Sequence, residues 1–218
     1  MSDERPEFRR ALRFRFLTRF YDPLIRWGLR EARVKRDLVG QAELHPGQSI
    51  LDVGCGTGTL AFAVQAACPE AHVVGLDADP DMLRIATGKA ARAESAVRFD
   101  QGLATGLPYS DGSFDHIFSS LMLHHLTGEE RRGTLREVVR VLRPGGRFHL
   151  VDWCQPHTRL LSIAFLVVRV LDGFGRTEDS ARGRLPALIR DAGLGEPEHL
   201  ARYTTVGGTL CRYRATRS

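Results

Sequence analysis

Leu51-Asp52-Val53-Gly54-Cys55-Gly56-Thr57-Gly58 is the stretch that decides the fold of this 218-residue chain. It continues the apolar run 49–53, which predicts a buried strand, and leads into the segment 59–67, which predicts a helix. The alternating glycines allow a tight turn, and a ligand can approach their peptide groups because no Cβ stands in the way. Free N–H groups at the start of the helix favour an anionic group there. The stretch therefore predicts a ligand-binding loop.

The spacing of the glycines separates two kinds of nucleotide-binding loop. A dinucleotide-binding loop has the pattern G-x-G-x-x-G, and its third glycine would fall at position 59. That position holds Thr59, and the observed pattern is G-x-G-x-G. The dinucleotide interpretation fails by one residue.

Outward from this loop, short β-rich runs alternate with helical stretches, which is the pattern of an α/β sheet. Strands are expected at Ser49–Val53, His72–Asp77, Val97–Asp100, His116–Ser120 and Arg147–Asp152, and helices at Thr59–Ala67, Asp81–Ala91, Glu129–Leu142 and about Leu185–Ala192. Pro144-Gly145-Gly146 is expected to end a helix and turn the chain into the next strand. The runs 200–206 and 209–215, on either side of Gly207-Gly208, predict an antiparallel hairpin that closes the sheet.

Composition and charge narrow the function classes. Hydrophobic residues make up 43% and charged residues 26%, which fits one globular domain. The net charge is +5, and the positive excess lies in residues 1–36, so the rest of the chain is close to neutral. Of the 31 basic residues only Lys35 and Lys89 are lysines. A near-neutral body gives no groove that tracks phosphates, and no nucleic-acid partner is expected.

Location and redox state follow from what the sequence lacks. It has no apolar run of about 18 residues, and its start, MSDERPEFRR, has no signal-peptide region, so a cytoplasmic protein is expected. The cysteines Cys55, Cys68, Cys154 and Cys211 are far apart and form no CxxC pair. In a cytosolic chain this spacing predicts four reduced thiols, with neither a disulfide nor a zinc site.

Two segments outside the sheet are conspicuously apolar. Phe8, Leu12, Phe16 and Phe20 recur every four residues among arginines, which predicts a basic amphipathic helix. This helix either packs its phenylalanines on the core or touches an anionic lipid surface. The run Leu160–Leu171 is long enough to roof a pocket and too short to span a bilayer. The two segments either pack on each other and on the core or form a lid over a ligand site, which would favour a ligand with a large apolar part.

Further motifs follow the glycine loop in order: Val74–Leu83, Leu107–Asp115, Leu123–Leu126 and Arg140–Gly146. Together they resemble class I S-adenosylmethionine-dependent methyltransferases, most closely the broad subgroup that includes the quinone-biosynthesis methyltransferases. The resemblance implies a Rossmann-like sheet of seven mostly parallel strands, with an antiparallel last strand and helices on both faces. It also divides a single domain into a helical lid (1–40), a cofactor-binding core (41–152) and an apolar cap helix with the C-terminal strands (153–218).

The resemblance implies S-adenosylmethionine as the cofactor. Asp52 would place its amino group, Asp77 would accept its ribose hydroxyls and Met82 would pack on its adenine, although Asp52 could instead cap the loop and Met82 belong to the core. The implied contacts are Tyr21, Asp52, Gly54, Cys55, Gly56, Gly58, Asp77, Ala78, Met82, Gln101, Gly102, Leu103 and Ser119. Leu103 stands where the family commonly has an aspartate for the adenine amino group, so Gln101, a backbone carbonyl or packing alone would replace that contact.

Candidate catalytic residues are His124, His125 and Asp152, near where two strands are expected to open onto the site. Methyl transfer is an in-line displacement that needs aligned reactants, and a base helps when the acceptor is a hydroxyl. Either histidine could instead be a hydrogen-bonded structural residue. No cluster has metal-ligand spacing, so no metal is expected.

Three functions are compatible with these motifs. The first is methyl transfer to a small molecule, with an apolar or aromatic acceptor expected. The second is methylation of nucleic acid, but Ser119-Ser120-Leu121-Met122 replaces the Asn/Asp-Pro-Pro-aromatic run typical of base-amine methylation. The third is a cofactor-binding protein without turnover, since a glycine loop shows binding and not catalysis.

Overall fold

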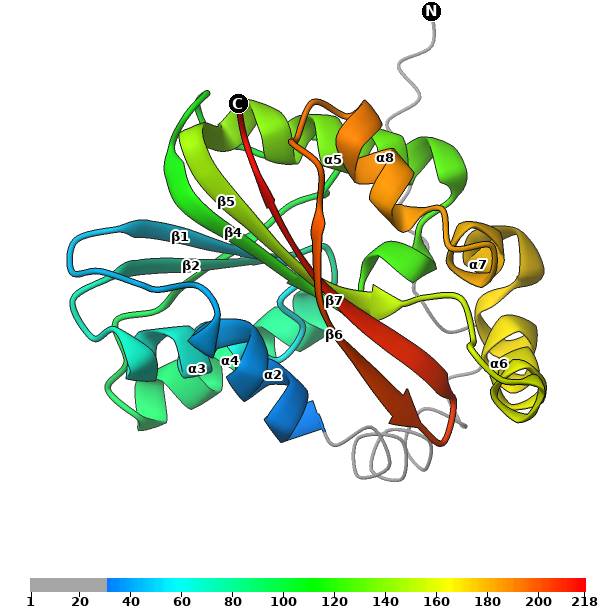
Figure 1. Cartoon of the computed structure of the whole chain (residues 1–218). Helices are drawn as coiled ribbons and strands as arrows, with labels where there is room; N and C mark the ends of the chain where they lie inside the picture. Colours follow the sequence, from blue (N-terminus) through cyan, green and yellow to red (C-terminus); the bar gives the residue numbers. More distant parts are fainter. Residues whose placement is uncertain (1–30) are drawn as a thin grey trace, which may run out of the picture.

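The computed structural model describes residues 31–218, which form one seven-stranded sheet covered by helices (Figure 1). The strands are β1 (Ser49–Val53), β2 (His72–Asp77), β3 (Arg98–Gln101), β4 (Phe114–Ser120), β5 (Leu142–Trp153), β6 (Glu198–Thr205) and β7 (Gly208–Thr216). Their order is β3-β2-β1-β4-β5-β7-β6, and β7 runs antiparallel to both of its neighbours. The expected Rossmann-like sheet with an antiparallel last strand is confirmed.

Helices cover both faces of this sheet. They are α2 (Glu31–Gly40), α3 (Thr59–Ala67), α4 (Pro80–Arg92), the 3-10 turn η1 (Leu123–His125), α5 (Gly128–Val141), α6 (Arg159–Asp172), α7 (Phe174–Ala181) and α8 (Leu185–Asp191). Figure 1 shows α2, α3 and α4 on one face and α5 and α8 on the other. Each face has its own apolar cluster, one packed around Leu38 and Leu60 and the other around Leu135 and Ile189. The sheet between them fixes the loops at its two edges.

Local sequence explains where several helices begin. Thr127 and Glu130 form a capping box at the start of α5, each side chain bonding the other's backbone N–H. Asp79 caps α4 by accepting from the Asp81 amide, and Pro80 follows it as the first helical residue. Thr158 caps α6 in the same way. These signals place the expected helices within a few residues of the observed ones.

The turn expected at Pro144-Gly145-Gly146 is wrong. The helix already ends at Val141, and β5 begins at Leu142, which pairs with Phe114 of β4. The register of this pairing then shifts before His116 pairs with Arg147. The proline and glycines therefore lie within an irregular stretch of β5, where such residues are tolerated in place of regular ladder pairing.

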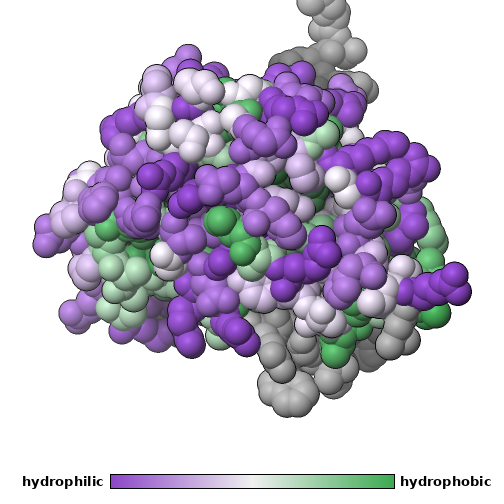
Figure 2. Space-filling model, in the orientation of Figure 1, coloured by the Kyte–Doolittle hydropathy of each residue, from purple (hydrophilic) through white to green (hydrophobic). Residues whose placement is uncertain are grey.

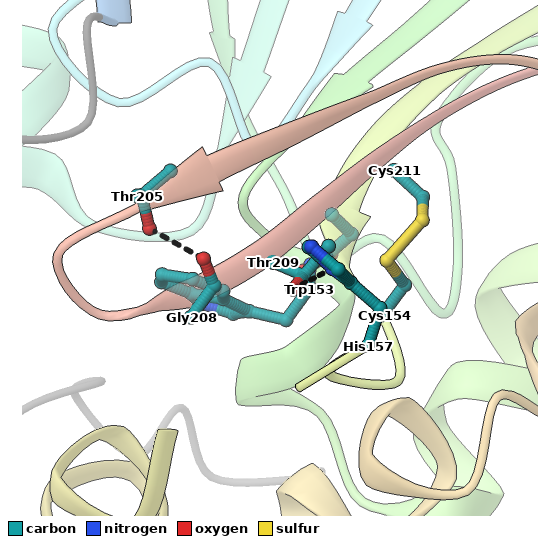
Figure 3. Close-up of a disulfide and its surroundings, with 8 residues drawn as sticks. Trp153, Cys154, His157, Thr205, Gly208, Thr209 and Cys211 are labelled. Atoms are coloured by element: carbon teal, nitrogen blue, oxygen red, sulfur yellow. Dashed lines mark hydrogen bonds between the residues drawn. A yellow bond between two sulfur atoms is a disulfide. The ribbon is translucent and has the colours of Figure 1, made fainter. Parts of the chain in front are cut away.

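The prediction of four reduced thiols is also wrong, because Cys154 and Cys211 form a disulfide (Figure 3). The two cysteines are 57 residues apart, and their Cα atoms lie 5.6 Å apart. The pairing of β5 with β7 produces this approach, since it sets Asp152 opposite Cys211. No spacing rule reveals a contact made by strand pairing across such a distance. Cys55 and Cys68 are free and buried.

The amphipathic segment of residues 8–20 and Tyr21 lie outside the described residues. Of the segment 1–40 that was expected to form a lid, the structure describes only α2. The apolar run Leu160–Leu171 does form a helix, α6. From Glu31 to the C-terminus, no helix combines the length and the apolar character that a bilayer crossing needs.

Candidate active site

The glycine loop is anchored to the end of β2. The amides of Gly54 and Cys55 both donate to the Leu76 carbonyl, at 2.8 and 3.0 Å. Gly54, Gly56 and Gly58 all have left-handed backbones, with φ of 73°, 54° and 77°. L-residues with a side chain rarely adopt this conformation, so the turn requires glycine at each of these positions.

The surroundings of the three glycines differ. A Cβ at Gly54 would clash with the Met122 side chain, and one at Gly58 would lie 2.6 Å from Phe99 Cζ. A Cβ at Gly56 would have nothing within 4 Å. Gly54 and Gly58 are therefore needed for packing as well, whereas Gly56 borders open space that a cofactor can use.

Asp77, the last residue of β2, faces the glycine loop. Its Oδ2 accepts from the Gly56 amide at 2.7 Å, and its Oδ1 accepts from the Asp79 amide at 2.9 Å. A carboxylate oxygen has two acceptor sites, so each oxygen can still accept one hydroxyl hydrogen. The carboxylate is thus fixed by the backbone and keeps the capacity to bind a ribose diol.

Asp52 on β1 is 2% exposed, and its Oδ2 has no hydrogen-bond partner within residues 31–218. Burial raises the pKa of this carboxyl to about 7; Lys35 lowers the pKa and Asp77 raises it. A buried carboxylate without a partner is costly, and a cationic donor would relieve that cost. The ammonium group of S-adenosylmethionine is such a donor, so the residues present fit the cofactor.

Both lysines of the chain lie at this loop, and sequence reasoning missed them. Lys89 of α4 donates to the Thr57 carbonyl at 3.0 Å and to its hydroxyl at 2.9 Å. Lys35 of α2 pairs with Glu31 and lies close enough to Asp52 to lower its pKa. Their rarity among 31 basic residues was the available signal.

Most other expected cofactor residues lie along the same edge of the sheet, where β1 to β4 end. Ala78 follows β2, and Met82 lies half-buried on α4. Gln101 ends β3 and is exposed, and Leu103 is half-buried. Ser119 is buried on β4, and its Oγ has no hydrogen-bond partner within the described residues. The Gly102 amide donates to the Asp77 carbonyl at 3.0 Å. Burial raises the pKa of the Cys55 thiol, which stays protonated. Tyr21 lies outside the described residues.

Two of the candidate catalytic residues are in direct contact. His124 Nδ1 lies 2.7 Å from Asp152 Oδ1, and both side chains are buried. The Trp153 amide donates to the same oxygen at 2.7 Å. Burial alone would raise the pKa of Asp152, but His124 and the Trp153 amide outweigh it and hold that pKa below its usual range. Asp152 is therefore ionised and accepts a hydrogen bond from His124 Nδ1–H.

His125 differs from its neighbour. Its ring centroid lies 3.9 Å from that of His124. Burial and, to a smaller extent, the adjacent His124 lower the pKa of His125 to about 3. A ring that stays neutral to such a low pH is a poor proton acceptor. The geometry favours His124 over His125 as a base.

Two contacts hold η1 beside the glycine loop. Leu121, at the end of β4, has a left-handed φ of 56°, which turns Met122 onto Gly54. Buried Arg131 of α5 donates to the carbonyls of Leu123 and Leu126 at 3.0 Å each, and also pairs with Asp179 of α7. Backbone strain of this kind often accompanies functional sites. The histidines are therefore positioned next to the cofactor loop.

A cavity of about 270 Å³ lies at the opposite edge, where β1, β4 and β5 begin. Its arginines, Arg143 and Arg147, already pair with Asp115 and Glu43. In this fold ligands bind at the carboxyl ends of the strands. The cavity is therefore separate from the candidate site.

These features define a class of protein, the one that binds S-adenosylmethionine on a Rossmann-like sheet. They are the strand order, the glycine loop, the Asp77 carboxylate held by backbone amides, and the buried Asp52 carboxylate with an unpaired oxygen. No such set is needed by a purely structural α/β domain.

Comparison with known proteins supports this class. A family model described as a methyltransferase domain matches residues 50–146. The demethylmenaquinone methyltransferase of Deinococcus radiodurans is 33% identical over 83% of this chain and 76% of that protein. A ubiquinone/menaquinone biosynthesis C-methyltransferase of Syntrophotalea carbinolica is 34% identical over 74% of this chain and 65% of its own. The YcgJ crystal structure from Bacillus has a TM-score of 0.70 at 21% identity, over 85% of this chain and 98% of that one.

The chain belongs to the S-adenosylmethionine-dependent methyltransferases, and S-adenosylmethionine is its cofactor. The structural likeness, at 21% identity, shows the shared fold.

Proposed function

We propose that this methyltransferase acts on a small aromatic acceptor that carries a ring hydroxyl and an apolar part, such as a quinol. The observation that carries the proposal is the 2.7 Å contact of His124 with Asp152 beside the glycine loop. Similarity to the two quinone methyltransferases supports the acceptor class. A near-neutral body argues against a nucleic-acid acceptor.

S-adenosylmethionine supplies an electrophilic methyl group on a positively charged sulfur. The residues that would hold it are the glycine loop, with Asp52 at its amino group and Asp77 at its ribose. The chain's own part is to align the acceptor with that methyl group, because in-line displacement depends chiefly on the placement of the reactants.

His124 would take the proton of the acceptor hydroxyl on Nε2. Asp152 would stabilise the resulting imidazolium and keep the ring in the required tautomer, as the carboxylate of a catalytic triad does. The acceptor anion then carries charge on its oxygen and on the neighbouring ring carbons, so it is a better nucleophile at either atom. After methylation at oxygen, His124 releases its proton to solvent. After methylation at a ring carbon, that carbon loses its hydrogen as a proton to solvent, and the ring oxygen takes a proton back from His124.

Turnover with a panel of quinols and phenols tests this proposal, with S-adenosylhomocysteine formation as the readout. Replacing His124 by Gln should lower kcat about 10²–10⁴-fold, the range that proton transfer contributes. His125→Gln is the matched control and should stay within about threefold. Both variants should bind S-adenosylhomocysteine normally.

Two outcomes would contradict separate parts of the proposal. Normal cofactor binding without turnover of any hydroxyl-bearing ring would refute the acceptor class. Full turnover by His124→Gln would refute the role of His124 as base. NMR of the methylated product would identify the atom that receives the methyl group.

A further inference from the structure

Helix α6 is apolar on both sides. Its inner side buries Leu161, Phe165 and Val168 against the sheet. Its outer side carries aliphatic residues at helical spacing that are largely exposed: Ile163 (67%), Leu166 (46%), Val167 (59%) and Val170 (64%). A surface helix normally turns polar residues outward. This helix does not.

Two further exposed apolar residues lie near α6. Phe174, the first residue of α7, is 50% exposed, and the Arg169 guanidinium lies 4.8 Å from its ring centroid. Val206 in the β6–β7 turn is 70% exposed, and the adjoining Gly207 lies beside Val168 of α6. We call the four outer residues of α6 together with Phe174 and Val206 the α6 patch.

The α6 patch contains nearly all of the large hydrophobic side chains that are exposed in the described part of the chain. Of the seven large hydrophobic side chains that are exposed within residues 31–218, six belong to it, and the other is Ile85 on α4. Figure 2 shows hydrophobic atoms along the edge where Figure 1 places α6. Exposed apolar side chains gathered in this way mark a contact surface.

We propose that the α6 patch docks on the surface of an anionic lipid bilayer. The size of the patch disfavours a stable dimer. A helix of 14 residues is roughly 21 Å long and about 10 Å wide, so its outer side offers on the order of 200 Å². A stable protein interface needs about 800 Å² from each partner. A bilayer surface needs no such area, because one apolar helix face can sink to the acyl boundary.

Charge favours an anionic surface. Arg159 begins α6 on the same outer side as Ile163 and Val170, and it is exposed. Arg182 and Arg184, whose side chains are 58% and 51% exposed, follow α7 and pair with Glu178 and Asp179. Basic residues around an apolar helix face strengthen its binding to anionic lipid.

The α6 patch is joined to the candidate catalytic residues. Arg131, which holds η1, also pairs with Asp179 of α7 and donates to the Arg176 carbonyl at 2.6 Å. Helix α7 directly follows α6. If the proposed acceptor class is right, docking would bring the site to a bilayer in which an apolar acceptor is dissolved; the docking itself does not depend on that function.

Co-sedimentation of the full chain with vesicles of 70% phosphatidylcholine and 30% phosphatidylglycerol tests the docking, without cofactor or acceptor. Val167→Gln/Val170→Gln should lower vesicle partitioning at least about tenfold, because two apolar anchors are lost. Ile85→Gln on α4 is the matched control and should stay within about twofold. Vesicles of phosphatidylcholine alone should bind the wild type several-fold more weakly.

A direct probe keeps the test decisive. Val167→Trp should show a blue-shifted emission on these vesicles, quenched by brominated lipid. Unchanged partitioning of Val167→Gln/Val170→Gln would overturn the proposal. Loss of vesicle binding in Arg9→Glu/Arg10→Glu/Arg13→Glu, with no loss in Val167→Gln/Val170→Gln, would also overturn it. A wild-type dimer that becomes a monomer in Val167→Gln/Val170→Gln would overturn it as well. Vesicle binding without methylation of any quinol would contradict the proposed function and leave the docking standing.

Discussion

The proposed cofactor side and the proposed acceptor side of this molecule are built from different kinds of contact. On the cofactor side, one loop of consecutive residues supplies the glycines, and Asp77 reaches back to Gly56 over 21 residues. On the acceptor side, the contact of His124 with Asp152 spans 28 residues and that of Arg131 with Asp179 spans 48. The first side is a local motif, and the second exists only once the sheet has formed.

This difference determines what a substitution should do. A change in the glycine loop or Asp77 should weaken cofactor binding and leave the acceptor side intact. A change in the His124–Asp152 pair or the disulfide should leave cofactor binding intact. The following variants test whether the two sides separate in this way.

The largest effect is expected for Asp152→Asn. An amide in place of the carboxylate cannot hold the His124 tautomer or stabilise its protonated ring, so kcat should fall about 10²–10⁴-fold. S-adenosylhomocysteine affinity, measured by calorimetry, should change less than about threefold. Asp111→Asn, an exposed carboxylate on the Arg140 side chain, is the control. A tenfold loss of cofactor affinity in Asp152→Asn would show that the two sides are coupled.

The next effect is on stability. Replacing Cys154 and Cys211 by alanine removes a cross-link over 57 residues, which should lower the free energy of unfolding by about 2–4 kcal/mol. Urea unfolding with and without reductant would measure it. Reductant should destabilise the wild type and leave the double variant unchanged. Reductant-insensitive unfolding of the wild type would show that the disulfide does not form.

The sequence predicts the parts of this structure that local signals determine, and it misses those that depend on contacts between distant segments. The strands β1 and β2 and helix α3 were predicted to the residue, because glycines and apolar runs are local signals. The disulfide was missed, since strand pairing alone brings its cysteines together. The sequence also could not distinguish His124 from His125. Only the contact with Asp152 separates them.

A smaller effect is expected on the cofactor side. Asp77→Ala removes the carboxylate that we propose accepts the ribose hydroxyls, and it leaves the Gly56 amide without its partner. The loss should be about 1.5–3 kcal/mol, or roughly 10–100-fold in S-adenosylhomocysteine affinity. Asp77→Asn keeps the shape of the side chain and one acceptor oxygen, so its affinity for S-adenosylhomocysteine should lie between those of the wild type and Asp77→Ala. Unchanged affinity in a folded Asp77→Ala would remove Asp77 from the binding site.

The smallest effect concerns pH and Asp52. Burial raises its pKa to about 7 in the free protein, so below that pH the folded chain holds a proton that the unfolded chain has released. Stability of the free protein should therefore fall as pH rises from about 4 to 7 and level off above it.

The affinity for S-adenosylhomocysteine should change with pH in the opposite direction to the stability. An ammonium group bound at Asp52 favours the ionised carboxylate, so binding below pH 7 must release the proton. Affinity for S-adenosylhomocysteine should then rise about eightfold from pH 6 to pH 7.5, the amount that ionisation of a group with a pKa near 7 gives. Asp52→Asn cannot release a proton and should bind with the same affinity at both pH values. Calorimetry in buffers of different ionisation enthalpy would count the released protons. A wild-type affinity that does not vary between pH 6 and 7.5 would mean that Asp52 does not meet the cofactor's amino group.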